Sequence, residues 1–104
     1  MKVKMAVDRL GALAQASRLT VFRFLVQHGH RGLCVGDIQT RLKLAPATLS
    51  FHLKTLSQAG LLVSRQEGRF IYYQPNFEVM NELIGYLTEN CCEGQGCAAT
   101  RSGC

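Results

Sequence analysis

The residues of this chain that are best suited to chemistry are its cysteines. Four of the five cysteines lie in the last fourteen of the 104 residues. Three of them, Cys91, Cys92 and Cys97, fall within the segment NCCEGQGC (90–97). Because thiolates bind soft metal ions and are readily oxidised, this clustering indicates a metal site or a redox-active site. Two glycines precede Cys97, and they give the backbone the freedom to bring its thiol back toward the other two.

The residues alone leave several ligands open for this cluster. Adding Cys104 would provide four thiolates, which suits tetrahedral zinc or cadmium. Six residues separate Cys104 from Cys97, and its terminal position makes it a weak fourth ligand. A thiol switch based on disulfides is another alternative, although Arg101 is the one basic residue near the cluster. The remaining alternative is a tail that binds no ligand.

The overall composition limits the class of protein that carries these thiols. A length of 104 residues predicts one domain. The apolar runs are too short to cross a membrane, and Asp8 and Arg9 interrupt any signal-peptide pattern at the basic start. We therefore expect a cytoplasmic protein with reduced thiols and no membrane partner. No nucleophile–base pair, phosphate loop or Cys-x-x-Cys motif is present, so an enzyme is not expected.

The charge of the chain is unevenly distributed. Residues 1–76 carry eleven Lys/Arg and three Asp/Glu, a net charge of +8, whereas residues 77–104 carry one Arg and four Glu, a net charge of −3. A basic body of this kind is typical of proteins that bind a polyanion, most often nucleic acid.

Apolar spacing predicts the elements that hold the thiols and the basic surface. Helices are expected over 3–15, 17–29, 35–44, 45–60 and 77–90, and two strands, 61–66 and 69–74, around a turn at Glu67-Gly68. Ser17 is the expected N-cap of the second helix, and Gly29 its stop. The last helix is expected to turn these residues inward: Phe77, Met80, Leu83, Ile84 and Leu87.

These elements predict a mainly α fold with a small β-hairpin, in the order ααααββα. Residues 1–90 would form one domain, and residues 91–104 a flexible, cysteine-rich tail. A short helix, a tight link and a second capped helix make a helix-turn-helix, and the hairpin directly after it makes the winged variant.

The second of these two helices, 45–60, has one apolar stripe and one polar face. Placing Leu49, Leu53 and Leu56 inward leaves a face without carboxylates, whose hydroxyl, amide and ammonium groups suit phosphates and base edges. Phe51 on this face suits a thymine methyl or, alternatively, a neighbouring helix. The predicted DNA-binding residues, including two wing arginines, are Ala47, Thr48, Ser50, Phe51, His52 (at the flank), Lys54, Arg65 and Arg69.

The segment LAPATLSFHLKTLSQAGLLVSRQEGRFIYYQ (44–74) closely resembles the helix-turn-helix and wing of the ArsR–SmtB family, the metalloid- and metal-responsive bacterial repressors. The similarity includes S-x-H-L-x-x-L-x-x-A-G-L from Ser50 to Leu61. SRLTVFRFL and LCVGDI resemble the second helix and the start of the third, so that the resemblance spans residues 6–88. It implies a homodimer, joined through its first and last helices, that binds an imperfect inverted repeat in double-stranded operator DNA until an inducer binds.

The resemblance also bears on the cysteines. Arsenic-responsive members capture As(III) with Cys-Val-Cys-Asp in the third helix, but here Cys34 is followed two residues later by Gly36. Cys34 alone cannot make a three-thiolate site, and we expect it to be a small buried residue. The last-helix zinc site of other members is also missing, since His28, His30 and His52 all lie elsewhere.

The tail is therefore the expected inducer site. Some arsenic-responsive members use cysteines at the end of the last helix, and As(III), a soft three-coordinate centre, suits Cys91, Cys92 and Cys97. The expected function is a metalloid-responsive repressor that As(III) or Sb(III) releases from its operator, with no permanently bound cofactor. A zinc-, cadmium- or thiol-redox-responsive repressor of the same fold is the alternative.

Overall fold

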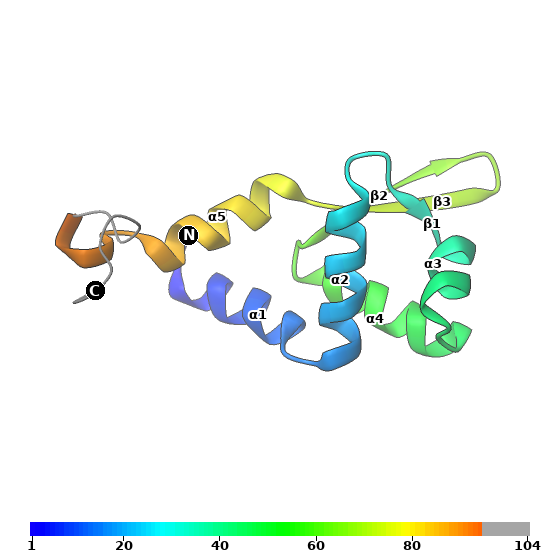
Figure 1. The fold of residues 1–104 in the computed structure, drawn as a ribbon, viewed down its shortest axis with the longest axis horizontal. Helices are drawn as coiled ribbons and strands as arrows, with labels where there is room; N and C mark the ends of the chain where they lie inside the picture. The colour runs from blue at the N-terminus through cyan, green and yellow to red at the C-terminus, as the bar shows by residue number, and fades with distance from the viewer. Residues whose placement is uncertain (95–104) are drawn as a thin grey trace.

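A computed structural model describes residues 1–94, so that Cys97 and Cys104 lie outside the described residues. This part of the chain contains five α-helices and a three-stranded sheet (Figure 1). The helices are α1 (Val3–Leu13), α2 (Ala16–His28), α3 (Val35–Leu42), α4 (Pro46–Gln58) and α5 (Phe77–Thr88). The strands are β1 (Leu33–Cys34), β2 (Leu62–Glu67) and β3 (Phe70–Pro75), and a short 3-10 helix, η1, spans Cys91–Gly94.

One apolar core joins the helices to the base of the sheet. Helix α2 crosses α4 and packs on β3 at the centre of the molecule. Burial of these side chains from water is the main favourable term that holds the elements together. The most deeply buried core residues are Val21, Leu25, Ile38, Leu49, Leu53, Leu56 and Leu61.

The local signals at the helix ends are largely confirmed. Gly29 ends α2 with a φ of 98°, and Pro46 occupies the first turn of α4. The predicted N-cap Ser17 is wrong. The helix begins one residue earlier, and the side chain of Gln15 accepts a hydrogen bond from the backbone N–H of Arg18 at 2.8 Å.

The sheet is larger than the predicted hairpin. Strand β1 pairs with β3 in antiparallel register, with Leu33 opposite Tyr73, so the strand order is β1-β3-β2. The hairpin itself is confirmed, but its turn lies one residue later than predicted, because Glu67 pairs with Phe70 and leaves Gly68 and Arg69 as the loop. Gly68 has a φ of 64°, which a two-residue hairpin turn requires and glycine adopts without strain.

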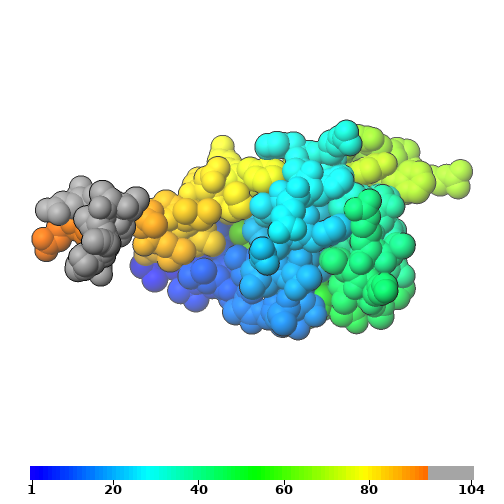
Figure 2. Space-filling view, viewed as in Figure 1, coloured from blue at the N-terminus to red at the C-terminus, as the bar shows by residue number. Residues whose placement is uncertain are grey.

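The molecule is elongated, and the elements predicted to bind DNA lie at the opposite end from α1 and the C-terminal part of α5. Its extents are 50 × 26 × 24 Å. Figure 1 shows α3, α4 and the β2–β3 wing at one end of the longest axis, and α1, α5 and η1 at the other. In the space-filling view, α1 and α5 form the narrow end next to the N-terminus (Figure 2).

The last helix differs from the prediction in what it buries. Leu83 is buried, and Phe77 and Met80 are half-buried, as expected. Ile84 and Leu87, however, are 53% and 59% exposed. Their inward placement was therefore wrong for the single chain, because the core of one chain does not extend to this end of α5.

Candidate DNA-binding face and thiol site

Helix α4 presents the predicted polar face to solvent. Beneath that face, Leu49, Leu53 and Leu56 are at most 2% exposed, so the stripe that orients the helix is confirmed. Phe51 is 61% exposed and does not pack on a neighbouring helix as the alternative required. An aromatic ring this exposed is available for contact with a thymine methyl. Five predicted DNA-binding residues share this exposed face: Ala47, Thr48, Ser50, Phe51 and Lys54.

A polar groove separates this face from the sheet. Its volume is about 390 Å³, and no carboxylate lines it. Hydroxyl groups and an ammonium group in a groove of this kind suit a phosphate backbone. The sequence had not singled out Ser57, Ser64 or Tyr73, although Ser57 lies two turns after Ser50 on the same side of α4. The polar residues of the lining are Ser50, Lys54, Ser57, Gln58, Ser64 and Tyr73.

Removing the charge of Lys54 should change how operator binding depends on salt. Each phosphate contact contributes about −0.9 to the slope of log affinity against log salt concentration. A dimer of the Lys54→Ala variant should therefore show a slope shallower by about 1.8 in anisotropy titrations between low and moderate salt. Lys4→Ala is the matched control, because the Lys4 side chain is exposed and α1, which carries it, lies at the other end of the molecule. This variant should keep the wild-type slope. An unchanged slope for Lys54→Ala would show that the Lys54 ammonium does not contact a DNA phosphate.

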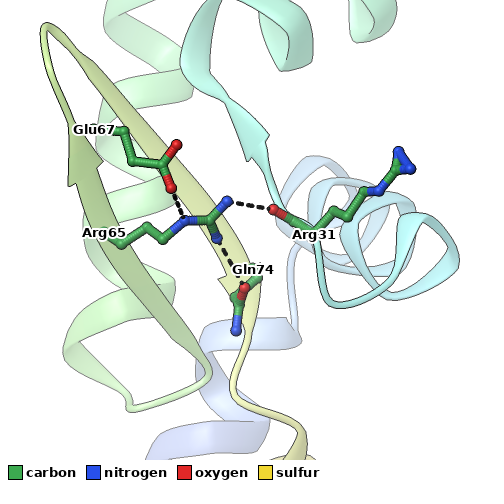
Figure 3. A network of polar contacts seen from close by, with 4 residues as sticks. All are labelled: Arg31, Arg65, Glu67 and Gln74. Atoms are coloured by element: carbon green, nitrogen blue, oxygen red, sulfur yellow. Dashed lines mark hydrogen bonds and ion pairs between the residues drawn. The ribbon is translucent and has the colours of Figure 1, made fainter.

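Arg65 of the wing is engaged within the protein (Figure 3). Its Nε donates to Glu67 Oε2 at 2.7 Å and its Nη1 to Gln74 Oε1 at 3.2 Å. Its Nη2 donates to the backbone carbonyl of Arg31 at 2.8 Å, and the guanidinium carbon lies 5.0 Å from the ring centre of Tyr72. Arg65 therefore braces the wing against the loop that follows α2, which positions the wing whether or not the side chain also meets DNA.

Two other arginines beside this brace extend into solvent. Arg69, in the wing turn, is exposed as predicted, and Arg31 is exposed with its guanidinium directed away from the network in Figure 3. Gly32, next to Arg31, has a φ of 76°, and an added Cβ there would lie 2.9 Å from the carbonyl oxygen of Tyr73. Arg31 was not among the predicted DNA-binding residues. Pairing of β1 with β3 is what brings it beside the wing.

His52 does not lie at the flank of the exposed face, as had been predicted. It is 6% exposed, and its Nδ1 is buried with no hydrogen-bond partner among the described residues. Burial, and secondarily the nearby charge of Arg18, lowers the pKa of His52 below its usual value. This side chain therefore belongs to the packing beneath α4 rather than to the surface that would meet DNA.

The placement of His52 predicts a pH dependence of stability. Because its folded pKa lies below the unfolded value of about 6.5, the unfolded state binds the proton more tightly. The free energy of unfolding should therefore be highest above that value and fall as the pH is lowered through it. Urea titrations at pH 7.5 and 5.5, at one protein concentration, should show a smaller loss for His52→Gln than for wild type. Equal losses in the two proteins would contradict this origin.

Cys91 and Cys92, the first two residues of the predicted ligand site, lie beyond the C-terminal end of α5. The Sγ atoms of Cys91 and Cys92 are 3.4 Å apart. Two sulfurs that bind one ion at about 2.3 Å can be at most about 4.6 Å apart, so this separation is compatible with a shared ion. Positive φ values at Asn90 and Cys92, of 57° and 55°, turn the chain away from the helix axis here. Within residues 1–94 no three His, Cys, Asp or Glu side chains could hold a metal together, and the predicted third ligand, Cys97, lies outside that range.

Cys34 occupies a separate place beside the helix-turn-helix. It is half-buried at the N-terminus of α3, and its thiol donates to Asp37 Oδ2 at 3.3 Å. Cys34 was predicted to be a small buried residue, and the structure shows that it is only half-buried. Figure 1 places β1 and α3 far from the thiols at the end of α5, so Cys34 does not join them within one chain.

An apolar surface covers the narrow end of the molecule. A groove of about 420 Å³ runs between α1, α2 and α5 and is lined mainly by aliphatic side chains such as Leu10, Met80 and Leu83. A groove lined by exposed apolar side chains is typical of a protein interface. Around it lie these exposed apolar residues: Val3, Val7, Leu10, Leu19, Ile84 and Leu87.

Comparisons with known proteins agree with this arrangement. A helix-turn-helix domain family matches residues 13–65. The arsenical resistance operon repressor of Bacillus subtilis is 36% identical over 85 residues, which cover 82% of this chain and 77% of the repressor. Among the helices of residues 1–94, none is long and apolar enough to cross a membrane.

Two solved relatives extend the comparison. HlyU of Vibrio cholerae, a transcriptional activator, is 31% identical over 88 residues, or 85% of this chain and 79% of HlyU. The structure of reduced HlyU covers 86% of this chain and 90% of its own with a TM-score of 0.66. A homodimeric winged helix-turn-helix DNA-binding domain from Mycobacterium bovis has a TM-score of 0.68 at 25% identity, over 90% of this chain and 87% of its own.

Proposed function

We propose that this chain, which belongs to the ArsR family of winged helix-turn-helix transcriptional regulators, is a homodimeric repressor. Regulators of this family bind DNA and are not enzymes. As(III) or Sb(III) would release the repressor from its operator. The inducer would bind Cys91 and Cys92, together with Cys97. Double-stranded operator DNA would bind the exposed face of α4 and the wing. The repressor function is that of the arsenical resistance relatives of the chain.

The observation that carries the DNA-binding part is the exposed, carboxylate-free face of α4 next to the wing. Leu49, Leu53 and Leu56 hold the opposite side of the helix in the core, so the polar face is presented rigidly. The groove beside it is lined by hydroxyl groups and Lys54. A rigid helix that projects polar groups without negative charge is suited to the major groove.

The dimer follows from the apolar end of the molecule. Exposed aliphatic side chains of α1 and α5, such as Val7, Ile84 and Leu87, need a cover that the single chain does not provide. A second copy of the same surface would bury them, and the relative from Mycobacterium bovis is homodimeric. Two helix-turn-helix units held in one dimer read two half-sites at a fixed spacing.

The thiol site connects these two parts. Cys91 and Cys92 follow α5 after two intervening residues, and α5 belongs to the proposed interface. Their sulfurs are close enough to share one ion. As(III) and Sb(III) are soft centres that prefer thiolates. Binding there would alter the end of the interface helix and the relative pose of the two reading heads. Coupling of this kind is typically worth about 1–3 kcal/mol, which is a 5- to 150-fold change in operator affinity.

A thiol-redox response is the second candidate. Its basis is the short Sγ–Sγ distance of 3.4 Å at the end of α5 and the similarity to HlyU, of which a reduced form has been solved. Oxidation of neighbouring thiols would change the same end of the interface helix without any metalloid.

One titration separates these candidates. We would follow the fluorescence anisotropy of a labelled promoter fragment bound by the reduced protein while adding arsenite, antimonite, zinc or cadmium, or hydrogen peroxide in the absence of reductant. Release by arsenite or antimonite under reducing conditions is the expected result. Release by peroxide alone would establish the redox response, and release by zinc or cadmium alone would establish a metal response. Failure of every addition to release the DNA would contradict a ligand-responsive repressor.

A further inference from the structure

Arg9 of α1 is a charged side chain that lies almost entirely inside the protein. It is 8% exposed, although arginine is seldom buried without a full set of partners. Its Nε donates to the backbone carbonyl of Ala59 at 3.3 Å, and Ala59 is the C-cap of the recognition helix α4. Its Nη1 lies 3.8 Å from Oε1 of Glu82 in α5. One guanidinium therefore touches the interface helix α1, the end of the recognition helix and the helix that leads to the thiols.

The contact with α4 is made where a cation is favoured. The C-terminal end of a helix carries partial negative charge on its last carbonyl groups. A Cβ added at Gly60 would lie 3.6 Å from Nη2 of Arg9, so the guanidinium lies over this end of α4. The backbone N–H of Asn76, the N-cap of α5, donates to the carbonyl of Leu61 at 2.8 Å, which is a second link between the two regions.

The contact with α5 is incomplete, and this makes it sensitive to movement. Nη1 of Arg9 is buried and has no hydrogen-bond partner among the described residues, and its distance to Glu82 exceeds that of a hydrogen bond. A shift of α5 by about 1 Å toward Arg9 would complete a charge-assisted hydrogen bond, and a shift away would leave a buried charge without compensation. The Glu82 side chain is itself 53% exposed, so solvent shares in this contact, and a displacement of α5 changes the partner that the buried Nη1 meets.

We propose that Arg9 is a positioning residue that couples the state of α5 to the pose of the recognition helix. The proposal rests on the proposed function, because α5 is the helix that would respond to the ligand. Glu82 lies six residues before Thr88, the last residue of α5, and two residues, Glu89 and Asn90, then separate α5 from Cys91. A displacement of α5 caused by ligand binding at this end would therefore reach Arg9 through Glu82, which lies on the same helix. Through its hydrogen bond to the carbonyl of Ala59, Arg9 would transmit this displacement to the C-terminal end of α4. The residues of α4 that are predicted to bind DNA lie nearer its N-terminal end.

The test compares Glu82→Gln and Arg9→Lys with wild type in the full-length, reduced protein. Glu82→Gln removes the charge of the pair, and Arg9→Lys keeps the charge but cannot reach Ala59 and Glu82 with separate donors. Glu78→Gln, an exposed charge removal one turn earlier on α5, is the matched control. Circular dichroism and sedimentation verify folding and dimerisation, and calorimetry measures the binding of arsenite itself.

The decisive quantity is the ratio of operator affinities without and with saturating arsenite. We expect Glu82→Gln and Arg9→Lys to bind arsenite as wild type does, while this ratio falls at least about fivefold toward unity, and Glu78→Gln to keep it. Wild-type ratios in both test variants, with folding and arsenite binding intact, would overturn the proposal.

A second readout needs no inducer and separates this proposal from the proposed function. If arsenite fails to release DNA even from wild type, the inducer assignment has failed, and the coupling is judged by a double-mutant cycle on operator affinity alone. Arg9→Lys, Glu82→Gln and the double variant should then show strongly non-additive effects, because each single change breaks the same contact. Additive effects would overturn the role of Arg9.

Discussion

Serine in place of Cys91 or Cys92 should abolish the release of operator DNA by arsenite while leaving repression intact. Each substitution removes one of the thiolates that a soft, three-coordinate centre needs, and the hydroxyl that replaces it is a poor ligand for such a centre. Both residues belong to η1, which lies at the opposite end of the molecule from α4 and the wing (Figure 1). We expect wild-type operator affinity without arsenite, and a loss of the whole 5- to 150-fold response with it.

The other cysteines supply the controls for this experiment. Cys97→Ser should behave like the first two variants, because Cys97 is the predicted third ligand. Cys34→Ser should respond like wild type, since its thiol bonds to Asp37 beside α3. Retention of the full response in both Cys91→Ser and Cys92→Ser would exclude the thiol site at the end of α5. A response that requires Cys104 as well would favour a four-thiolate site for zinc or cadmium.

A glutamate at Leu87 or Ile84 should dissociate the dimer and weaken operator binding by about 100-fold or more. Both side chains are more than half exposed in the single chain and lie at the groove between α1, α2 and α5. A carboxylate there would have to be desolvated in the interface, which is unfavourable without a partner. Loss of the dimer removes the second half-site contact, and linked contacts of this kind typically raise affinity by about 10²- to 10⁴-fold.

Sedimentation equilibrium and operator titration would measure the two consequences separately. Gly85→Glu is the control, because it adds the same charge to the same helix about 100° around from Ile84. An added Cβ at Gly85 meets no atom within 4 Å. If the Leu87→Glu variant remains dimeric and binds the operator normally, the dimer interface does not include this end of α5.

The recognition helix shows how much of the site follows from sequence alone. Leu49, Leu53 and Leu56 recur with the helical period, so their burial and the exposure of the opposite face are determined by local geometry. Pro46 and Gly60 mark the ends of this segment for equally local reasons. The order of the helices and the position of the wing could therefore be predicted to within a residue or two.

Several features that the sequence did not predict depend on contacts between distant residues. Strand β1 is two residues long, and only its pairing with β3, some forty residues later, makes it a strand. His52 is buried and lies within reach of the charge of Arg18 because α2 packs against α4, which the period of α4 does not specify. The intramolecular partners of Arg65, Gln74 and the carbonyl of Arg31, are brought to it by the sheet, while its contact with DNA stays a prediction.

The sequence by itself therefore determined the five helices, the β2–β3 hairpin, the exposed face of α4 and the presence of a cysteine cluster after α5. These follow from residue type and short-range spacing, which act within a few turns of one helix. Only the tertiary structure decided which charged groups are buried, which apolar side chains stay exposed for a second copy, and that Arg9 joins α1, α4 and α5. Those properties arise where segments far apart in the chain meet, because burial and electrostatic pairing are set by neighbours in space.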